Sequence, residues 1–430
     1  MNILLVIPDI KLHYANGSYV MPSLVRTSSG GCQILAALTP REHSVTIIEE
    51  INGEKTDFSD NYDLVGISMM TAQAARGYEI ADAFKKLGVP VVIGGFHASL
   101  MPEEALLHAD AVCVGEGEKV WHTILDDTLH NRLSGIYRAE KLIDMSEVPF
   151  QRRELVKKGM KNNILTSRGC PYHCVFCSII KFFGNTYRVR PVGEVIGEIT
   201  EMKRKRFLKY NIVLFSDDNI VGDRAYAKEL FTALIPLKIR WVSQASINIA
   251  ADDELLDLAK KSGCTALTIG FESVSKASLI AANKTVRIDY ETAIQKIHGK
   301  KIAIVGMFIY GFDTDTTDIF EETVDFVEKN CLEYAAFCIL TPYPGTPVYA
   351  QLEREGRLLH KNWEDYDMIH TVFTPKNMTA EELQRGRYVS AAKINSLRSV
   401  VKRVFGARTK ILFPLALNFA MRKIYKNIKL

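Results

Sequence analysis

The sequence has no acidic side chain from residue 383 to residue 430, although twelve lysines and arginines occur in this segment. The whole chain of 430 residues has a net charge of +4, so the remainder carries about −8. The excess positive charge therefore belongs to the C-terminal segment.

Long hydrophobic runs are also missing. The apolar stretch Ile411–Met421 is interrupted by Pro414 and Asn418, and it is shorter than the about 20 residues that a membrane-spanning helix needs. Basic residues flank the stretch on both sides: Arg408, Lys410, Arg422 and Lys423. Two interpretations follow, a helix lying on an anionic membrane surface or a basic helix packed on the rest of the protein. We expect no nucleic-acid partner, because no recognised binding module accompanies the charge.

A secretory leader is not expected, because Met1–Ile7 is short and has no basic start. No low-complexity tract occurs, and the apolar and charged fractions are ordinary for a globular protein. These features predict a protein of the reducing cytoplasm. The basic segment leaves membrane association open as a second possibility.

Cysteine is sparse outside one short stretch. Five of the eight cysteines lie singly in apolar or mixed surroundings, as core thiols do: Cys32, Cys113, Cys264, Cys331 and Cys338. The other three, Cys170, Cys174 and Cys177, lie within eight residues at a C-x3-C-x2-C spacing. Gly169 and Pro171 favour a tight turn, so a compact loop can direct three thiolates toward one centre.

Three thiolates are one ligand short of the complete sulfur coordination of an iron–sulfur cluster, so one iron would stay open to another ligand. An open metal position is typical of a reactive site. Three other interpretations stay open, namely buried structural cysteines, a disulfide and a zinc site. Zinc would need a fourth cysteine or histidine at a suitable spacing, and we expect the side chain of His173, inside the motif, to point away.

The spacing of Cys170, Cys174 and Cys177 after a strand-like run resembles the motif of the radical S-adenosylmethionine (SAM) superfamily. The resemblance implies that the three cysteines hold a 4Fe–4S cluster whose open iron chelates SAM. In that superfamily an electron from the cluster cleaves SAM to methionine and a 5′-deoxyadenosyl radical. An external electron donor of the flavodoxin or ferredoxin kind is implied as well.

The first part of the chain alternates between apolar, β-branched runs and helical patterns, which predicts a doubly wound parallel sheet of the α/β class. The predicted strands are Asn2–Ile7, Val45–Glu49, Leu64–Ser68, Val89–Gly94 and Ala111–Gly115. The predicted helices are Gly31–Leu38, Ala72–Leu87, Pro102–Leu107 and Glu118–Leu129. Ligands of such sheets bind beyond the carboxyl ends of the strands, where this sequence carries small residues and glycines.

These strand ends resemble the cobalamin-binding, Rossmann-like domain that precedes the barrel in one radical SAM subclass. The carriers of the resemblance are the segment Ser68–Thr71, the pair Gly94 and Gly95, and the run Gly94–Ala105. The resemblance implies cobalamin, with Ser68, Thr71, Gly94 and Gly95 as contacts. The alternative is a domain of this fold that has lost the cofactor or binds substrate alone.

One departure from the cobalamin pattern concerns the loop after the first strand. Relatives of the methionine synthase type carry Asp-x-His-x-x-Gly there, whose histidine coordinates cobalt. Here Asp9, His13 and Gly17 are spaced too widely. We therefore expect His13 to be a loop histidine rather than a cobalt ligand.

The second part of the chain predicts a partial (β/α)6 barrel, the architecture of radical SAM cores. The predicted strands are Asn163–Ser167, Asn211–Ser216, Arg240–Ser246, Thr265–Phe271, Ala303–Tyr310 and Tyr334–Thr341. The predicted helices are Val192–Arg206, Arg224–Ile235, Asp253–Lys261, Tyr290–Lys300 and Thr317–Lys329. We expect four regions: a cobalamin-binding domain over 1–140, a linker over 141–162, the radical SAM core over 163–350, and a basic helical region over 351–430.

Barrel chemistry lies at the carboxyl ends of the strands. By position in the resemblance, Asp217, Asp218 and Glu272 are candidates for contacts to SAM, and Phe176 for a contact to its adenine. The usual Gly-Gly-Glu after the second strand is absent, so Asp217 or Asp218 could instead cap the next helix. Arg188 suits binding of a carboxylate or phosphate, or else lies on a solvated face.

The resemblance as a whole implies a cobalamin-dependent radical SAM enzyme that methylates an unactivated carbon, or phosphorus, of a small-molecule or lipid substrate. Cyclisation, coupling or oxidation without methyl transfer is the alternative within the same architecture. A methylthiotransferase would need a second group of three cysteines, which Cys32 and Cys113 cannot supply. A non-catalytic sensor or partner subunit is the alternative of another class.

Overall fold

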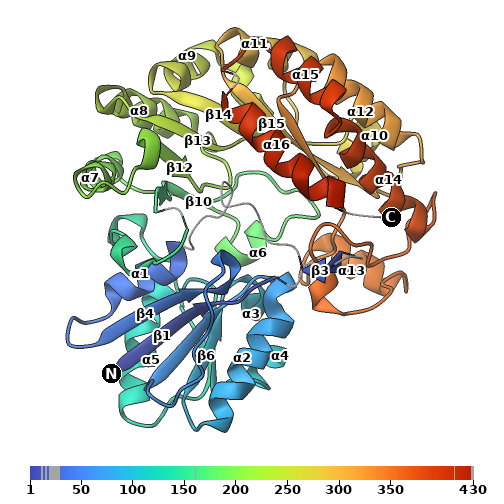
Figure 1. Ribbon diagram of the computed structural model, residues 1–430. Coiled ribbons are helices and arrows are strands. Elements are labelled where there is room, and N and C mark those ends of the chain that lie inside the picture. The colour runs from blue at the N-terminus through green and yellow to red at the C-terminus, as the bar shows by residue number, and fades with distance from the viewer. Residues whose placement is uncertain (11–12, 15–16, 19–29, 160, 411, 428–430) are drawn as a thin grey trace. The chain divides into compact units, whose positions relative to one another are not determined.

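The computed structural model describes residues 1–10, 13–14, 17–18, 30–159, 161–410 and 412–427 (Figure 1). The chain divides into two compact units. The first comprises Met1–Asn163, Ser178–Gly184 and Asn362–Asp367, and the second comprises Ile164–Cys177, Asn185–Lys361 and Met368–Leu430. The expected domain limits at residues 140, 162 and 350 stay predictions.

The first unit is built on a six-strand parallel sheet with the order β4-β1-β5-β6-β7-β8. Its strands are β1 (Asn2–Ile7), β4 (Ser44–Glu49), β5 (Leu64–Ser68), β6 (Val91–Gly94), β7 (Ala111–Val114) and β8 (Gly135–Arg138). The chain passes from β1 to β4 on one side and then to β5 on the other, so the winding reverses at β1. This reversal confirms the predicted doubly wound sheet.

Helices cover both faces of this sheet because successive side chains of each strand point to opposite sides. Ile3 and Leu5 of β1 share one buried cluster with α1 (Gly30–Leu38) and α5 (Trp121–Leu129). The other face packs against α2 (Ala74–Lys86). Two short helices, α3 (Phe96–Leu100) and α4 (Pro102–Leu106), follow β6.

One strand of the first sheet was not predicted. β8 pairs with the edge of β7, and its four residues alternate between half-buried and exposed positions. The inner strands are buried on both faces and form continuous apolar runs, whereas this edge strand has no such run. A two-residue hairpin, β2 (His13–Tyr14) with β3 (Gly17–Ser18), completes the strands described in this unit.

The second unit contains a six-strand sheet of the order β16-β15-β14-β13-β12-β9, whose neighbours from β12 to β16 are parallel. Its strands are β9 (Asn163–Ile164), β12 (Ile212–Phe215), β13 (Arg240–Ala245), β14 (Cys264–Glu272), β15 (Ala303–Tyr310) and β16 (Tyr334–Ile339). Strands adjacent in sequence are adjacent in the sheet, as in a barrel. Because β16 and β9 stand at its two edges, the sheet is open, which confirms the partial barrel.

Helices connect these strands: α7 (Val192–Arg204), α8 (Arg224–Leu234), α9 (Asp253–Lys261), α10 (Lys276–Ala281), α11 (Tyr290–Gly299) and α12 (Ile319–Lys329). The side chain of the residue just before a helix can accept a hydrogen bond from a first-turn amide that has no partner within the helix. Asp223 accepts from the amide of Tyr226 before α8, and Asp252 accepts from the amide of Leu255 before α9. Each such cap stabilises its helix by about 1 kcal/mol.

The predicted strand Asn163–Ser167 is divided in the structure. After β9 the amide of Thr166 donates to the carboxyl of Asp217 at 3.1 Å instead of continuing the sheet. The next residues form β10 (Ser167–Gly169), which pairs antiparallel with β11 (Tyr187–Val189). The division places a separate two-strand ribbon at the start of the cysteine loop.

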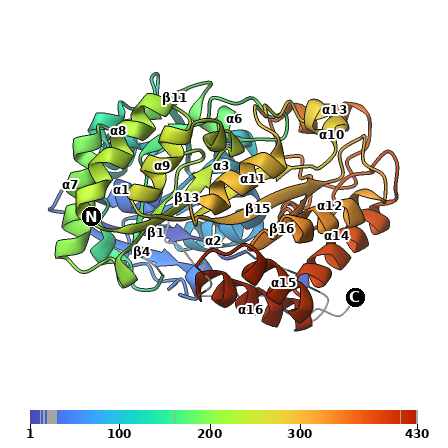
Figure 2. The ribbon, with the colours of Figure 1, turned by 90° about the horizontal axis from the view of Figure 1, so that it is seen from above.

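Four helices follow the sheet: α13 (Pro347–Arg354), α14 (Ala380–Ile394), α15 (Leu397–Gly406) and α16 (Leu412–Asn427). The predicted start at Thr379 is confirmed, because Thr379 and Glu382 form a capping box. α14, α15 and α16 contact one another, and α14 and α16 contact β16 (Figure 2). Pro414 lies in the first turn of α16, where proline is tolerated. None of the described helices is long and apolar enough to cross a membrane.

Candidate functional site

The three clustered cysteines lie in the loop that follows β10. Gly169, the last residue of β10, has φ of +89°, a left-handed conformation that glycine adopts without strain. The amide of Cys177 donates to the carbonyl of Cys174 at 3.1 Å and closes a turn between them. Cys170 and Cys174 form no disulfide in the described structure, so their thiols remain available to a metal.

The cysteine loop is anchored through its backbone. The amide of Val175 donates to the carbonyl of Ala282 at 3.2 Å, and its carbonyl accepts from the amide of Val348 at 3.3 Å. Asn283 Nδ2 donates to the carbonyl of His173 at 2.8 Å. The side chain of His173 is exposed, consistent with the expectation that it points away from the cysteines. These contacts fix the loop without using a thiol.

A single metal ion has no ready site in the described part of the chain, where no three His, Cys, Asp or Glu side chains are gathered around one point. A 4Fe–4S cluster is a larger object, because it places a separate iron beside each thiolate. The donor set of three cysteine thiols on one short, fixed loop therefore fits a cluster better than it fits zinc.

The surroundings of the cysteines raise the pKa values of their thiols, so the thiolates are disfavoured unless a metal binds them. Burial, opposed by the Lys284 cation and reinforced by the Glu272 charge, raises the pKa of the Cys174 thiol to about 11. Burial also raises the pKa of the Cys170 thiol. Because only a thiolate binds a metal, iron must compete with a proton at these positions. The nearby cation of Lys284 stabilises the thiolate and therefore favours binding of iron over binding of a proton.

Lys284 and Glu272 form a buried ion pair beside this loop. Lys284 Nζ donates to Glu272 Oε1 at 2.7 Å, and each side chain is only 11% exposed. Burial by itself lowers the pKa of Lys284, but the charges of Glu272, Cys174 and Cys170 together raise it above its ordinary value. The sequence predicted Glu272 as a site residue and missed Lys284.

The backbone at the end of β14 is shaped around this pair. Glu272 has φ of +63°, which is rare for a residue with a side chain, and the register between β14 and β15 shifts there. A Cβ atom on Gly270 would lie 2.3 Å from Glu272 Oε1 and 3.2 Å from Lys284 Nζ. Unusual backbone held by its surroundings is common at functional sites.

Asp217 and Asp218 follow the carboxyl end of β12, as Glu272 stands at the carboxyl end of β14. Asp217 is fully buried, and its Oδ1 accepts from Thr166 Oγ1 at 2.8 Å and from Ser167 Oγ at 2.5 Å. Burial raises the pKa of Asp217 to about 6, although these hydrogen bonds oppose the rise. Burial and then the charge of Asp217 raise the pKa of Asp218 to about 7.

The contacts of Asp217 tie β12 to the start of the cysteine loop. The cap of α8 is Asp223, so the following helix does not depend on Asp217 or Asp218. Asn219 Nδ2 is buried without a hydrogen-bond partner in the described structure. Its side chain is close enough to lower the pKa of Cys170 by a hydrogen bond. Asn219 Nδ2 is therefore a donor placed to stabilise a thiolate at Cys170.

Phe176 lies inside the cysteine loop, between Cys174 and Cys177, and Arg188 lies on the strand that pairs with β10. The ring of Phe176 lies 6.1 Å from the ring of Phe312, which follows β15. Arg188 lies on β11 and is paired in register with Arg168 of β10. Contacts of Phe176 and Arg188 with SAM stay predictions.

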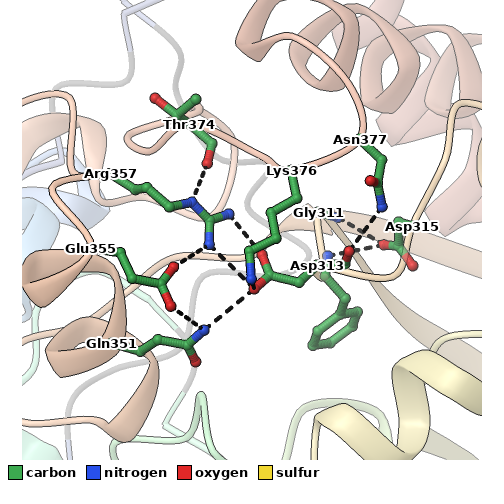
Figure 3. Close-up of polar contacts among 10 residues, drawn as sticks. Gly311, Asp313, Asp315, Gln351, Glu355, Arg357, Thr374, Lys376 and Asn377 are labelled. Carbon is green, nitrogen blue, oxygen red and sulfur yellow. Dashed lines mark hydrogen bonds and ion pairs between the residues drawn. The ribbon is translucent and has the colours of Figure 1, made fainter.

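The loop that carries Phe312 is held by a polar network that the sequence did not reveal (Figure 3). Asp315 Oδ2 accepts from the amides of Gly311 and Phe312, both at 3.0 Å. Arg357 donates through both terminal nitrogens to Asp313, at 2.7 and 3.2 Å. The network joins this loop to the segment after α13 and fixes the ring that packs on Phe176.

The first unit brings together the residues predicted to contact cobalamin. Ser68 ends β5 and Gly94 ends β6, and the two are paired in register. Gly95 has φ of +92°, and a Cβ there would lie 2.7 Å from the amide nitrogen of Met69. Thr71 is buried in the turn that follows. The side chain of His13 lies outside the described residues.

A largely buried polar network lies on the helices that follow β5 and β6. His97 is fully buried, with its Nε2 3.1 Å from Tyr78 Oη. Glu104 Oε1 accepts from Tyr78 Oη at 2.9 Å and from Trp363 Nε1 at 2.7 Å. Burial alone would raise the pKa of Glu104, but hydrogen bonds from His97, Tyr78 and Trp363 hold it below its usual range. No sequence pattern connects Trp363 to this unit.

A cluster of three aromatic rings lies beside the carboxyl end of β6. The ring of Phe96, next to Gly95, stacks on Phe182 at 4.1 Å and 13°, and Phe183 packs edge-on against both. Phe182 and Phe183 belong to α6 (Ile179–Phe183), which directly follows the cysteine loop in sequence. This stacking explains why the segment after the cysteines packs with the first unit.

Two family models match the chain. The radical SAM superfamily model matches residues 164–327, and the B12-binding domain model matches residues 30–125. The first match contains the cysteine loop, Asp217 and Glu272, and the second contains Ser68 and Gly95. Each model thus falls on the candidate site that the geometry indicates.

Among curated proteins, the chain is similar to bacteriochlorophyllide d C-12(1)-methyltransferase of Chlorobaculum tepidum, with 33% identity over 87% of this chain and 84% of that protein. Bacteriochlorophyllide d C-8(2)-methyltransferase of the same organism is 32% identical over 79% of each chain. Hopanoid C-2 methylase of Rhodopseudomonas palustris is 27% identical over 77% of this chain and 65% of that protein.

Solved structures share the fold. The radical SAM methyltransferase TsrM of Kitasatospora setae, with cobalamin and a 4Fe–4S cluster bound, has a TM-score of 0.63 at 17% identity, covering 82% of this chain and 78% of its own. The cobalamin-dependent radical SAM enzyme OxsB, with aqua-cobalamin and SAM bound, has a TM-score of 0.71 at 16% identity, covering 99% of this chain and 71% of its own.

Proposed function

The chain belongs to the radical SAM superfamily, among the members that carry a cobalamin-binding domain, and from this premise we propose that it methylates an unactivated carbon of a polycyclic, poorly water-soluble substrate. The observation that carries the proposal is the similarity to two bacteriochlorophyllide methyltransferases over most of the chain. Bacteriochlorophyllides and hopanoids are both polycyclic, which supports the substrate class.

The broader expectations from the sequence are confirmed by the comparisons. These are membership of the family, an enzyme that transfers a methyl group, and the cofactors 4Fe–4S cluster, SAM and cobalamin. Methyl transfer is favoured over cyclisation, coupling or oxidation because two relatives with 33% and 32% identity are named methyltransferases.

In the second unit, Cys170, Cys174 and Cys177 would hold the cluster, and Lys284 and Glu272 would bind the charged groups of SAM. When bound, the cluster supplies the electron that cleaves SAM, and cobalamin carries the methyl group to be transferred. The Lys284 ammonium suits a carboxylate, and the Glu272 carboxylate suits an ammonium or hydroxyl. The low exposure of this pair supports a site from which water is excluded.

In the first unit, Ser68, Thr71, Gly94 and Gly95 would receive cobalamin at the ends of β5 and β6. The absence of a Cβ at Gly94 and Gly95 lets a large flat ligand approach the backbone closely. The network of His97, Glu104 and Trp363 would hold the segments after β5 and β6 in place. Its residues are positioning groups and need not touch the cofactor.

Two features of the partners belong to the proposal as well. An external electron donor of the flavodoxin or ferredoxin kind would reduce the cluster. The substrate would be delivered in the cytoplasm, with contact between the C-terminal region and a membrane surface as an additional feature.

The test is an anaerobic reaction of the cluster- and cobalamin-loaded protein with SAM labelled on its methyl group. Bacteriochlorophyllide d serves as the probe substrate, and dithionite as the electron source. We expect the label in the product, with 5′-deoxyadenosine and S-adenosylhomocysteine formed in about equal amounts. Cleavage of SAM with an unlabelled, cyclised or oxidised product would instead support the alternative radical chemistry.

Two variants make this test specific. Cys174→Ala removes one cluster ligand and should abolish SAM cleavage, whereas Cys331→Ala, at another half-buried cysteine, should leave it unchanged. SAM cleavage by Cys174→Ala at the wild-type rate would contradict the assigned cluster site. Absence of any SAM cleavage by the loaded wild-type protein would support the non-catalytic alternative.

A further inference from the structure

Helix α15 has an apolar stripe on its outer side that nothing in the described structure covers. Leu397, Val401 and Phe405 are 52%, 45% and 56% exposed. They are spaced by four residues, so they line one side of the helix, and we call them the α15 face. Exposed apolar side chains are common singly, but an aligned set of three on one helix is a candidate contact surface.

The exposure of the α15 face does not come from a loosely attached helix. The adjoining side of α15 is buried through Val400 and Val404. Arg403, fully buried, donates to the carbonyls of Leu332 at 2.8 Å and Ile394 at 2.7 Å. The helix is therefore held by its buried side chains. The three side chains of the α15 face take no part in that packing.

Basic residues lie on α15 and in the segment directly after it. Arg398, Arg408 and Lys410 are exposed, and no ion pair is seen for them among the residues that the structure describes. Burial and then the nearby charge of Lys410 lower the pKa of Lys260. Cations that crowd one another while unpaired indicate a surface prepared for an anion.

Three acidic groups near α15 are already engaged. Glu328 pairs with Lys402 at 3.1 Å, and Glu321 lies 4.0 Å from Lys393. Glu333 is buried and accepts from His298 and Thr409. No acidic residue occurs in 383–430. The segment that contains α15 therefore carries positive charge alone.

We infer that the α15 face docks on an anionic lipid bilayer, with Leu397, Val401 and Phe405 inserted at the interface and the surrounding cations on lipid headgroups. The combination of an apolar stripe and a basic surround is typical of helices that lie in the plane of a membrane. A nucleic acid would use the cations but not the apolar stripe. The inference does not rest on the proposed methyl transfer, and it concerns residues outside both candidate cofactor sites.

The test measures co-sedimentation of the full-length, cluster-loaded protein with vesicles under anaerobic conditions. The probes are vesicles of phosphatidylcholine with phosphatidylglycerol, and vesicles of phosphatidylcholine alone. We expect binding to the anionic vesicles, weakened by added salt. The variant with Leu397→Gln, Val401→Gln and Phe405→Gln should bind about tenfold or more weakly. Removing the charges of Arg398 and Lys410 should weaken binding by about fivefold each.

Matched controls lie in the first unit. Leu129→Gln changes a residue that is 53% exposed, and Lys85→Gln with Lys86→Gln removes two exposed cations. Both controls should bind as the wild type does. SAM cleavage should be unchanged in every variant, which separates loss of docking from loss of folding or of the proposed function.

Three results would overturn the inference. The first is failure of the wild type to bind anionic vesicles, and the second is equal binding by the triple variant. The third is self-association of the wild type in sedimentation velocity that the triple variant loses, which would make the α15 face an interface between copies of the chain.

Discussion

The buried pair of Lys284 and Glu272 leads to a prediction with a worked magnitude. At 2.7 Å and an effective dielectric constant of about 20, the attraction between the two charges is about 6 kcal/mol. Burial of both ions costs several kcal/mol and offsets most of this attraction. The intact pair therefore contributes little net stability, but removal of one partner leaves the other charge buried and alone.

Lys284→Met should lower the free energy of unfolding by about 3 kcal/mol at pH 7. Removing one partner of a buried pair typically costs about 3–5 kcal/mol. An upper limit comes from proton uptake, because protonating an ordinary glutamate carboxyl at pH 7 costs about 3.7 kcal/mol. The 11% exposure of each side chain admits some water and places the expected loss toward the lower end of this range.

The assay is urea denaturation of the anaerobic protein without its cluster, so that metal binding does not enter the comparison. The double variant Lys284→Met with Glu272→Gln should recover about 2 kcal/mol of the loss, because no isolated charge remains. Lys329→Met is the matched control, since its pair with Glu291 is 70% and 45% exposed and should contribute at most about 1 kcal/mol. Additive effects of the two substitutions, or equal losses in Lys284→Met and Lys329→Met, would refute the reasoning.

Three further predictions concern the supports of the two sites. Gly95→Ala should destabilise the first unit in urea denaturation because its Cβ would lie 2.7 Å from a backbone nitrogen, whereas Gly94→Ala, with 3.5 Å of room, should leave stability unchanged. Both variants should reduce cobalamin retention, measured by the visible spectrum after desalting, because each adds a Cβ where the proposed ligand approaches the backbone. Burial raises the pKa of Asp217 to about 6, above its unfolded value, so the stability that this group contributes below about pH 4 is lost as the pH rises to about 6. Asp217→Asn should therefore gain about 3 kcal/mol relative to the wild type between these pH values in urea denaturation, and a constant difference would contradict the burial argument. Trp363→Phe keeps the ring but removes the bond to Glu104, so it should cost about 1.5–3 kcal/mol and weaken cobalamin retention, whereas unchanged stability would show that this bond is dispensable.

The sequence was sufficient for the features that depend on local patterns. The inner strands of both sheets are continuous apolar runs, and the cysteine loop is a motif within eight residues. Glu272 and Asp217 were predicted as site residues because the carboxyl ends of parallel strands are known places for ligands, and their contacts with SAM stay predictions. The edge strand β8 was missed because a half-exposed strand of four residues carries too little hydrophobic pattern.

The remaining features depend on tertiary contacts between distant residues. Lys284 lies between two helices and acquires its meaning only through the bond to Glu272. Trp363 donates to Glu104, 259 residues away, and the pairing of Arg357 with Asp313 crosses 44 residues. Such partners leave no periodic signal in a single sequence. The packing of Phe182 on Phe96 likewise follows from shape and not from any spacing of residues.

The central claim is that one chain holds both an iron–sulfur cluster and cobalamin. It is tested most directly by reconstituting the protein anaerobically with iron, sulfide and hydroxocobalamin, and then measuring both cofactors in the desalted protein. We predict about one cluster and about one cobalamin per chain, with loss of the cluster alone in Cys174→Ala. A protein that retains the cluster and cleaves SAM, yet never retains cobalamin, would contradict the account.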